Sequence, residues 1–155
     1  MARQTKKHMS EQDKEDWDEL YEYVKTNVLC YDENQSLSKN MVLRLKGLLN
    51  NKFIANNNIE DTANYSYKTV LNTFKFCMFE IQKGLRSNTF KDESHKFNYV
   101  LKIVENNLNT VYLRMKNSEK TKLKTETMNV DSIMHSGASY QTKTTKTSDR
   151  LSDLW

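Results

Sequence analysis

The side chains best suited to catalysis are few in this sequence and lie far apart. The histidines are His8, His95 and His135, and the cysteines are Cys30 and Cys77. Catalysis needs convergent groups, such as a nucleophile with its base, paired carboxylates or a set of metal ligands. His95 and the nearby Glu93 are two residues apart in an expected helix, so they point to different faces and are badly placed to share a metal.

Neither the cysteines nor the glycines have the spacing of a cofactor site. Cys30 and Cys77 lack the CxxC spacing of a zinc or redox site. We expect them to be buried free thiols in helices, with a disulfide or a reactive thiol as the alternative. The three glycines, Gly47, Gly84 and Gly137, are too far apart to form a phosphate-binding loop. The sequence therefore predicts a protein that is not an enzyme and holds no cofactor or metal.

Basic residues gather in the middle of the chain and at its N-terminus. Residues 39–91 contain nine Lys or Arg and three acidic residues, a net charge of +6, whereas the whole chain carries +4. Clustered cations are typical of proteins that bind phosphates, although an ordinary solvated face is the alternative. The residues that we expect to contact DNA are Arg3, Lys6, Lys7, Arg44, Lys46, Lys52, Ser66, Tyr67, Lys68, Asn72 and Lys75.

One stretch of this basic region resembles a helix-turn-helix motif. Residues 59–63 (IEDTA) resemble its first helix, and residues 66–70 (SYKTV) resemble the start of its recognition helix. The resemblance implies that Ser66, Tyr67, Lys68 and Asn72 face the major groove and that Lys75 reaches a phosphate. Only two residues separate the two segments, fewer than the motif usually has. The alternative is a short loop that caps a core helix.

Two further segments suggest a protein partner. Residues 150–155 (RLSDLW) are similar to the peptide that binds the bacterial sliding clamp, which implies that Leu151, Leu154 and Trp155 are anchors in a partner's pocket. Arg150 stands where that peptide has glutamine, and one extra residue separates the leucines. Trp155 could instead fold back onto its own chain. Residues 11–19 contain six acids, which suit either a DNA-mimicking inhibitor or the positive end of a helix dipole.

Two blocks resemble a wider group of proteins. Residues 90–109 and 146–155 look like uncharacterised helical proteins of phages and integrative elements of low-GC Gram-positive bacteria. This resemblance implies a mobile-element protein with a part in replication or regulation. Our first hypothesis is an accessory protein that binds DNA through the basic central surface. The alternative is an inhibitor or adaptor that binds a protein and makes no contact with nucleic acid.

Composition predicts an all-α fold to position these side chains. The chain has no proline and three glycines, whereas β-rich folds need many of both at their turns. The sequence contains no run of 18 or more apolar residues, which a transmembrane helix would need. The N-terminus also lacks a signal-peptide segment, so we expect a cytoplasmic protein. The partner, any DNA sequence preference and the oligomeric state stay open.

Apolar periodicity and capping residues predict a bundle of four helices. The expected ranges are about 10–30, 38–50, 66–86 and 92–117, with caps at Ser10, Ser38, Ser66 and Asp92. Asn58 could cap one further short turn at 59–63. We expect a flexible basic arm at 1–9, a helical domain at 10–117, and a Ser/Thr-rich tail at 118–155 that is disordered or loosely docked.

Overall fold

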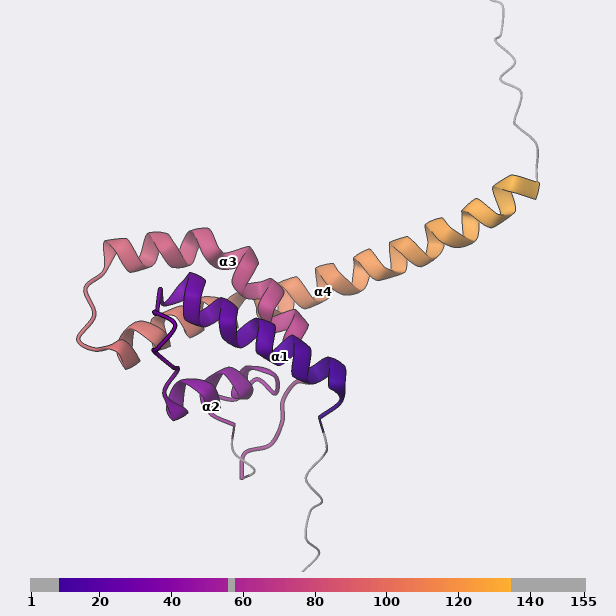
Figure 1. The fold of residues 1–155 in the computed structure, drawn as a ribbon. Coiled ribbons are helices and arrows are strands. Elements are labelled where there is room, and N and C mark those ends of the chain that lie inside the picture. Colours follow the sequence, from indigo (N-terminus) through magenta and orange to yellow (C-terminus); the bar gives the residue numbers. More distant parts are fainter. Residues whose placement is uncertain (1–8, 56–57, 135–155) are drawn as a thin grey trace, which may run out of the picture. The chain divides into compact units, whose positions relative to one another are not determined.

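The structure, a computed structural model, describes residues 9–55 and 58–134, with side chains up to residue 127. Within these residues it contains helices and no strand (Figure 1), which confirms the all-α prediction. The elements are α1 (Glu11–Tyr23), η1 (Val24–Val28), α2 (Lys39–Leu48), α3 (Tyr67–Ser87) and α4 (Glu93–Met134). The chain divides into two compact units, Met1–Glu119 and Lys120–Trp155.

The four α-helices begin where the capping residues predicted. At each start, a side-chain oxygen accepts a hydrogen bond from the amide three residues later, which satisfies one of the unpaired donors of the first turn. The four bonds are Asp13 N–H to Ser10 Oγ at 3.1 Å, Met41 N–H to Ser38 Oγ at 3.3 Å, Thr69 N–H to Ser66 Oγ at 3.1 Å, and His95 N–H to Asp92 Oδ1 at 2.6 Å.

The first helix ends in a π-helical turn, which is wider than the α-helical turn expected from the sequence. α1 continues into the π-helical η1, where the Leu29 amide donates to the Val24 carbonyl at 3.0 Å, five residues back. Cys30 follows with a φ of 55° and is exposed, so the prediction of a buried helical thiol is wrong for this residue. Cys77 is buried within α3, as expected.

The last helix is longer than its apolar stripe indicated. α4 runs to Met134, whereas we expected an end near 117 and a disordered or loosely docked tail beyond it. The segment from 118 to 134 has no regular apolar period, but it contains no glycine or proline and several good helix formers. The hydroxyls of Thr125 and Thr127 donate to carbonyls of the preceding turn, at 2.9 and 3.1 Å, and so fit within the helix.

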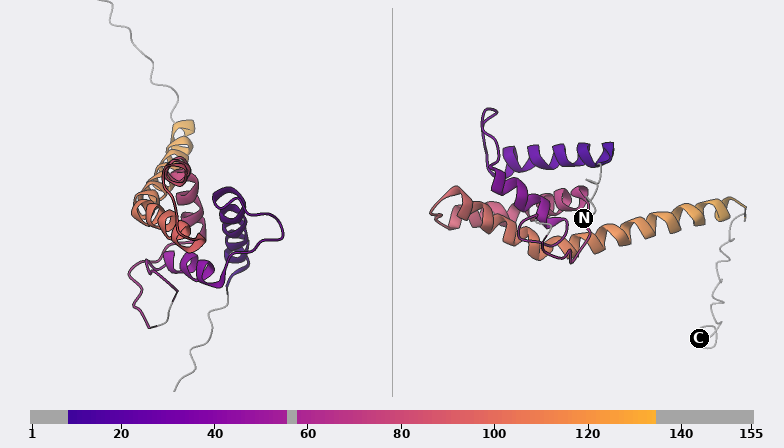
Figure 2. Two further views of the ribbon diagram at one scale, coloured as in Figure 1. Left: turned by 90° about the vertical axis from the view of Figure 1, so that its left-hand side faces the viewer. Right: turned by 90° about the horizontal axis from the view of Figure 1, so that it is seen from below.

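The helices of the first unit share one apolar core. α1, α2, α3 and the first part of α4 are grouped together in both views of Figure 2, and all four contribute to one cluster of buried residues. The predicted apolar stripes supply the buried side chains, which include Leu20, Val24, Leu45, Val70, Phe74, Ile81, Phe97, Val100, Val104 and Leu108. This arrangement confirms the four-helix bundle.

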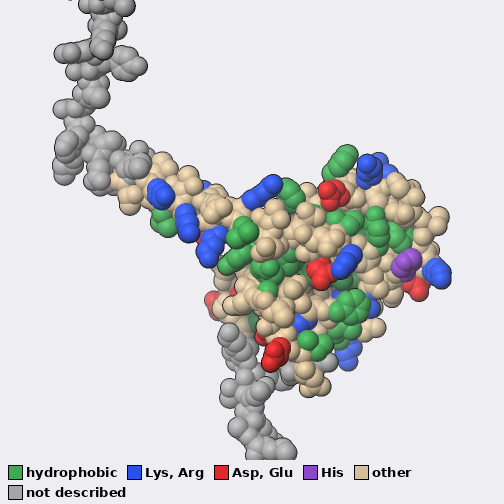
Figure 3. Space-filling model, turned by 180° about the vertical axis from the view of Figure 1, so that it is seen from behind, with side chains coloured by type: hydrophobic (Ala, Val, Ile, Leu, Met, Phe, Trp, Pro, Cys, Tyr) green, Lys and Arg blue, Asp and Glu red, His purple; other side chains and the backbone are tan. Residues whose placement is uncertain are grey.

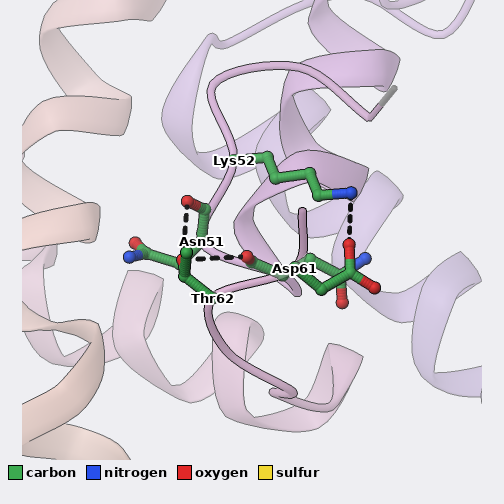
Figure 4. A network of polar contacts seen from close by, with 5 residues as sticks. Asn51, Lys52, Asp61 and Thr62 are labelled. Carbon is green, nitrogen blue, oxygen red and sulfur yellow. Dashed lines mark hydrogen bonds and ion pairs between the residues drawn. The ribbon is translucent and has the colours of Figure 1, made fainter. Parts of the chain in front are cut away.

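The connector between α2 and α3 is not helical, so the short helix predicted at 59–63 is wrong. Its backbone amides bond to the carbonyl end of α2 instead of to their own preceding turn. Thr62 N–H donates to the Asn50 carbonyl at 3.1 Å, and Tyr65 N–H donates to the Leu49 carbonyl at 2.7 Å. The Thr62 hydroxyl and a Lys52–Asp61 ion pair hold the same loop (Figure 4).

Candidate nucleic-acid interface

The side of α3 that faces away from the core combines cations with aromatic rings. α3 contains four basic residues and a single acid, Glu80. At 3.6 residues per turn, seven of its side chains fall within an arc of about 100°, with Glu80 at the margin. We call this arc the α3 outer face, and its residues are Lys68, Asn72, Lys75, Phe76, Phe79, Lys83 and Arg86.

α1 borders one side of this face. The ammonium group of Lys75 lies 3.0 Å from a carboxylate oxygen of Glu19 and 5.6 Å from the ring centre of Tyr23. Burial raises the pKa of Tyr23, and the nearby Lys75 partly opposes that rise. The ion pair is more than two fifths exposed on both sides, so it is weak and easily exchanged for another anion.

α4 borders the other side. The Arg114 guanidinium lies 5.0 Å from the ring centre of Phe76, and the Asn72 amide group donates to the Met115 sulfur at 3.4 Å. Near the start of α3, a surface hollow of about 290 Å³ is lined in part by Lys68 and Lys116, together with the acid Glu119. A second hollow of about 340 Å³ includes Lys83 near the end of the helix. α4 thus adds cations beside the outer face of α3.

The predicted cations of α2 and its connector are engaged elsewhere. The Arg44 guanidinium lies 4.4 Å from the ring centre of Phe53, and the Lys46 ammonium lies 4.9 Å from that of Trp17. The side chain of Lys52 is 7% exposed and pairs with Asp61. Half-buried cations held against rings and carboxylates are less free to meet a phosphate than Lys68, Lys83 and Arg86 of α3, which are exposed.

Three residues expected to read the major groove also have structural contacts. The Ser66 hydroxyl caps α3, the Tyr67 ring packs edge-on against Trp17 at 5.3 Å between centres, and Asn72 bonds to Met115. The fourth residue expected to face the groove, Lys68, is exposed and lies outside the core. Because the preceding segment is also not helical, the helix-turn-helix resemblance is not confirmed.

Six other predicted contact residues lie outside the part of the chain that the structure describes. They are Arg3, Lys6 and Lys7 of the basic N-terminal arm, and Leu151, Leu154 and Trp155 of the C-terminal segment. Their proposed roles remain predictions.

Two exposed phenylalanines of α3 and two of the cations beside them were not among the contact residues expected from the sequence. Phe76 is 50% exposed and Phe79 is 77% exposed. Lys83 and Arg86 were counted in the basic region but were not assigned to a contact surface. The exposure of the two phenylalanines could be predicted from the sequence, because both rings lie outside the apolar stripe that supplies the core side of this helix.

Two features are absent from the described residues. These residues contain no group of three or more His, Cys, Asp or Glu side chains that could hold a metal ion. No helix in the same part of the chain is long and apolar enough to cross a membrane.

Fold and surface define a small helical-bundle protein with a basic and aromatic helix face. Residues 2–154 match the model of the family described as SPbeta prophage protein YorH, so the chain belongs to this prophage family. The match confirms the expected phage or mobile-element origin. No curated protein and no solved structure matches the chain.

Proposed function

We propose that this prophage accessory protein binds DNA through the α3 outer face and acts in phage replication or regulation. The observation that carries the proposal is the charge of this one helix. Lys68, Lys75, Lys83 and Arg86 lie on one arc, and Glu80 is the only acid of the helix. Arg114 and Lys116 of α4 add to the same positive potential.

The geometry of the face suits a run of phosphates. Lys68 and Arg86 are eighteen residues apart, which corresponds to roughly 27 Å along the helix axis at 1.5 Å per residue. A single DNA strand carries a phosphate about every 3.4 Å along a duplex axis, so the four cations can reach several phosphates in succession. Such contacts give affinity without sequence specificity.

Neutralising three exposed cations tests this proposal. We expect the Lys68→Gln, Lys83→Gln, Arg86→Gln variant to bind labelled duplex DNA more weakly than the natural protein. The slope of log affinity against log salt should become shallower by about 0.9 for each phosphate that the variant no longer neutralises. Fluorescence anisotropy over a series of salt concentrations measures both quantities.

The control variant removes the same charge from other exposed positions, Lys14→Gln, Lys39→Gln and Lys102→Gln. It should keep nearly the natural affinity if the α3 outer face is the binding surface. Equal reductions of DNA affinity in the two variants would show that binding depends on total charge and not on the α3 outer face. No detectable binding at low salt would refute DNA binding.

A protein-binding inhibitor or adaptor is the second candidate, and the exposed acids of the first helix favour it. The acidic residues exposed on α1 are Glu11, Glu15, Asp18, Glu19 and Glu22. A dense row of carboxylates can occupy a basic groove on another protein. Failure of the natural protein to bind DNA at low salt would favour this candidate over the first.

A further inference from the structure

Two large aromatic rings on the α3 outer face are left in solvent. Phe79 is 77% exposed and Phe76 is 50% exposed. Isolated exposed apolar side chains are common, but rings grouped within a functional surface are informative. Both rings lie on the arc that holds Lys75, Lys83 and Arg86, and the acid Glu80 lies at its margin. Over α3, at the upper right of Figure 3, hydrophobic side chains lie next to basic ones, with an acidic side chain among them.

The spacing of the rings suits successive bases. Phe76 and Phe79 are three residues apart, which places them on one side of the helix and separates them by roughly 4.5 Å along its axis. This separation is of the same order as the 3.4 Å or so between neighbouring nucleotides of a stacked strand. Phe76 already has the Arg114 guanidinium 5.0 Å from its ring centre, while Phe79 is the more open ring.

A duplex would use the cations of this face but not its rings. In a duplex the flat faces of the bases are stacked on one another, so a protein surface meets phosphates and groove edges. In a single strand the bases are free to stack on aromatic side chains while the backbone follows a basic track. The alternation of rings and cations on α3 therefore favours a single strand.

We propose that the α3 outer face binds single-stranded DNA, with bases stacked on Phe76 and Phe79 and phosphates held by Lys68, Lys83 and Arg86. This inference rests on the proposed function and specifies its ligand. Lys75 joins the phosphate contacts by exchanging its weak pair with Glu19 for the DNA backbone.

The test measures binding of a labelled oligo(dT) and of a duplex of equal length to the full chain. The natural protein should bind the single strand more tightly. Phe79→Ala should weaken single-strand binding roughly fivefold to 100-fold, the usual effect of removing one stacking ring, with a smaller effect on the duplex. The salt slope should not change, because every cation is retained.

Three further variants separate stacking from other effects of the substitution. Phe79→Trp should keep the affinity, whereas Phe79→Leu should reduce it, since leucine is apolar but cannot stack. Phe53→Ala is the matched control, because Phe53 is 67% exposed and lies outside α3. Circular dichroism of each variant should show unchanged helicity.

The possible results distinguish this inference from the proposed function. Equal affinity for duplex and single strand, or an unaltered affinity of Phe79→Ala, overturns the single-strand inference while DNA binding by the cations stands. Equal reductions of single-strand affinity in Phe79→Ala and Phe53→Ala also overturn the single-strand inference. If neither oligonucleotide binds at low salt, the proposed function itself fails.

Discussion

The two thiols of this chain have opposite surroundings. Cys30 is exposed in the turn that follows η1, where its φ is positive. Cys77 is 1% exposed within α3, and burial, with a smaller contribution from Glu80, raises the pKa of its thiol to about 11. Because the thiolate is the reactive form, this shift and the lack of access both protect Cys77.

We therefore expect a single fast-reacting thiol in the folded protein. At pH 8, a disulfide reagent such as 5,5′-dithiobis(2-nitrobenzoate) should modify one thiol per chain quickly and the second only after addition of guanidinium chloride. The replacement Cys30→Ser should abolish the fast phase, and Cys77→Ser should leave it intact. Fast release of two equivalents from the natural protein would contradict the burial of Cys77.

At the residue scale, the sequence correctly predicted the helix caps, which depend on contacts between residues close together in the chain. The caps at Ser10, Ser38 and Ser66 are confirmed, because their bonds reach only three residues along the chain. The exposure of Cys30 was not predicted, because it follows from where a π-turn ends. The exposure of Phe79 could be predicted from its place off the apolar stripe.

At the scale of elements, α2 depends on a close approach by its own connector. A β-carbon added to Gly47 would lie 2.6 Å from the Lys52 carbonyl oxygen and 3.0 Å from the Ala55 nitrogen. Hydrogen bonds hold this backbone in place, since Lys52 N–H donates to the Gly47 carbonyl at 2.8 Å and Ala55 N–H donates to the Leu43 carbonyl at 2.9 Å. Because these neighbours are backbone, they cannot rotate away as a side chain could.

Replacing Gly47 with alanine should consequently lower stability. Alanine favours a helix by up to about 1 kcal/mol over glycine, but overpacking costs about 1–3 kcal/mol and displaces the loop. We expect the free energy of unfolding in urea to fall by roughly 1 kcal/mol or more. Asn40→Ala, at an exposed position of the same helix, should have no such effect. A stability gain in Gly47→Ala would show that the connector yields easily.

Helix starts were easier to predict than helix ends or the connector. Each start has a local capping signal, and the apolar stripes of α3 and α4 have a clear period. The conformation of the connector was predicted wrongly, because Thr62 and Tyr65 donate to carbonyls that directly follow α2 and lie more than ten residues away in the sequence. Such a bond between distant segments leaves no periodic pattern.

At the scale of the whole molecule, the buried side chains belong to the first unit. The apolar core cluster runs from Leu20 to Leu108 and lies within Met1–Glu119. Along the described residues from Lys116 to Thr127, every side chain is exposed. Stability of the fold should thus arise from the first unit.

Deletion of residues 120–155 should leave the melting temperature almost unchanged. The truncated chain keeps the whole core cluster, so its cooperative transition at 222 nm should lie within about 3 °C of the full chain, roughly the shift that 1 kcal/mol causes in a protein of this size. Its total helical signal should fall, because part of α4 is removed. A melting temperature lower by much more than that would show that the second unit stabilises the first.

The ring of Trp17 gives the bundle an optical reporter. Trp17 lies 5.3 Å from the Tyr67 ring centre on α3, 6.1 Å from that of Tyr21 on its own helix, and 4.9 Å from the Lys46 ammonium on α2. Its emission depends on three helices being assembled around it. In a chain whose other tryptophan, Trp155, is replaced by phenylalanine, the fluorescence spectrum would follow assembly of α1, α2 and α3 without any attached dye.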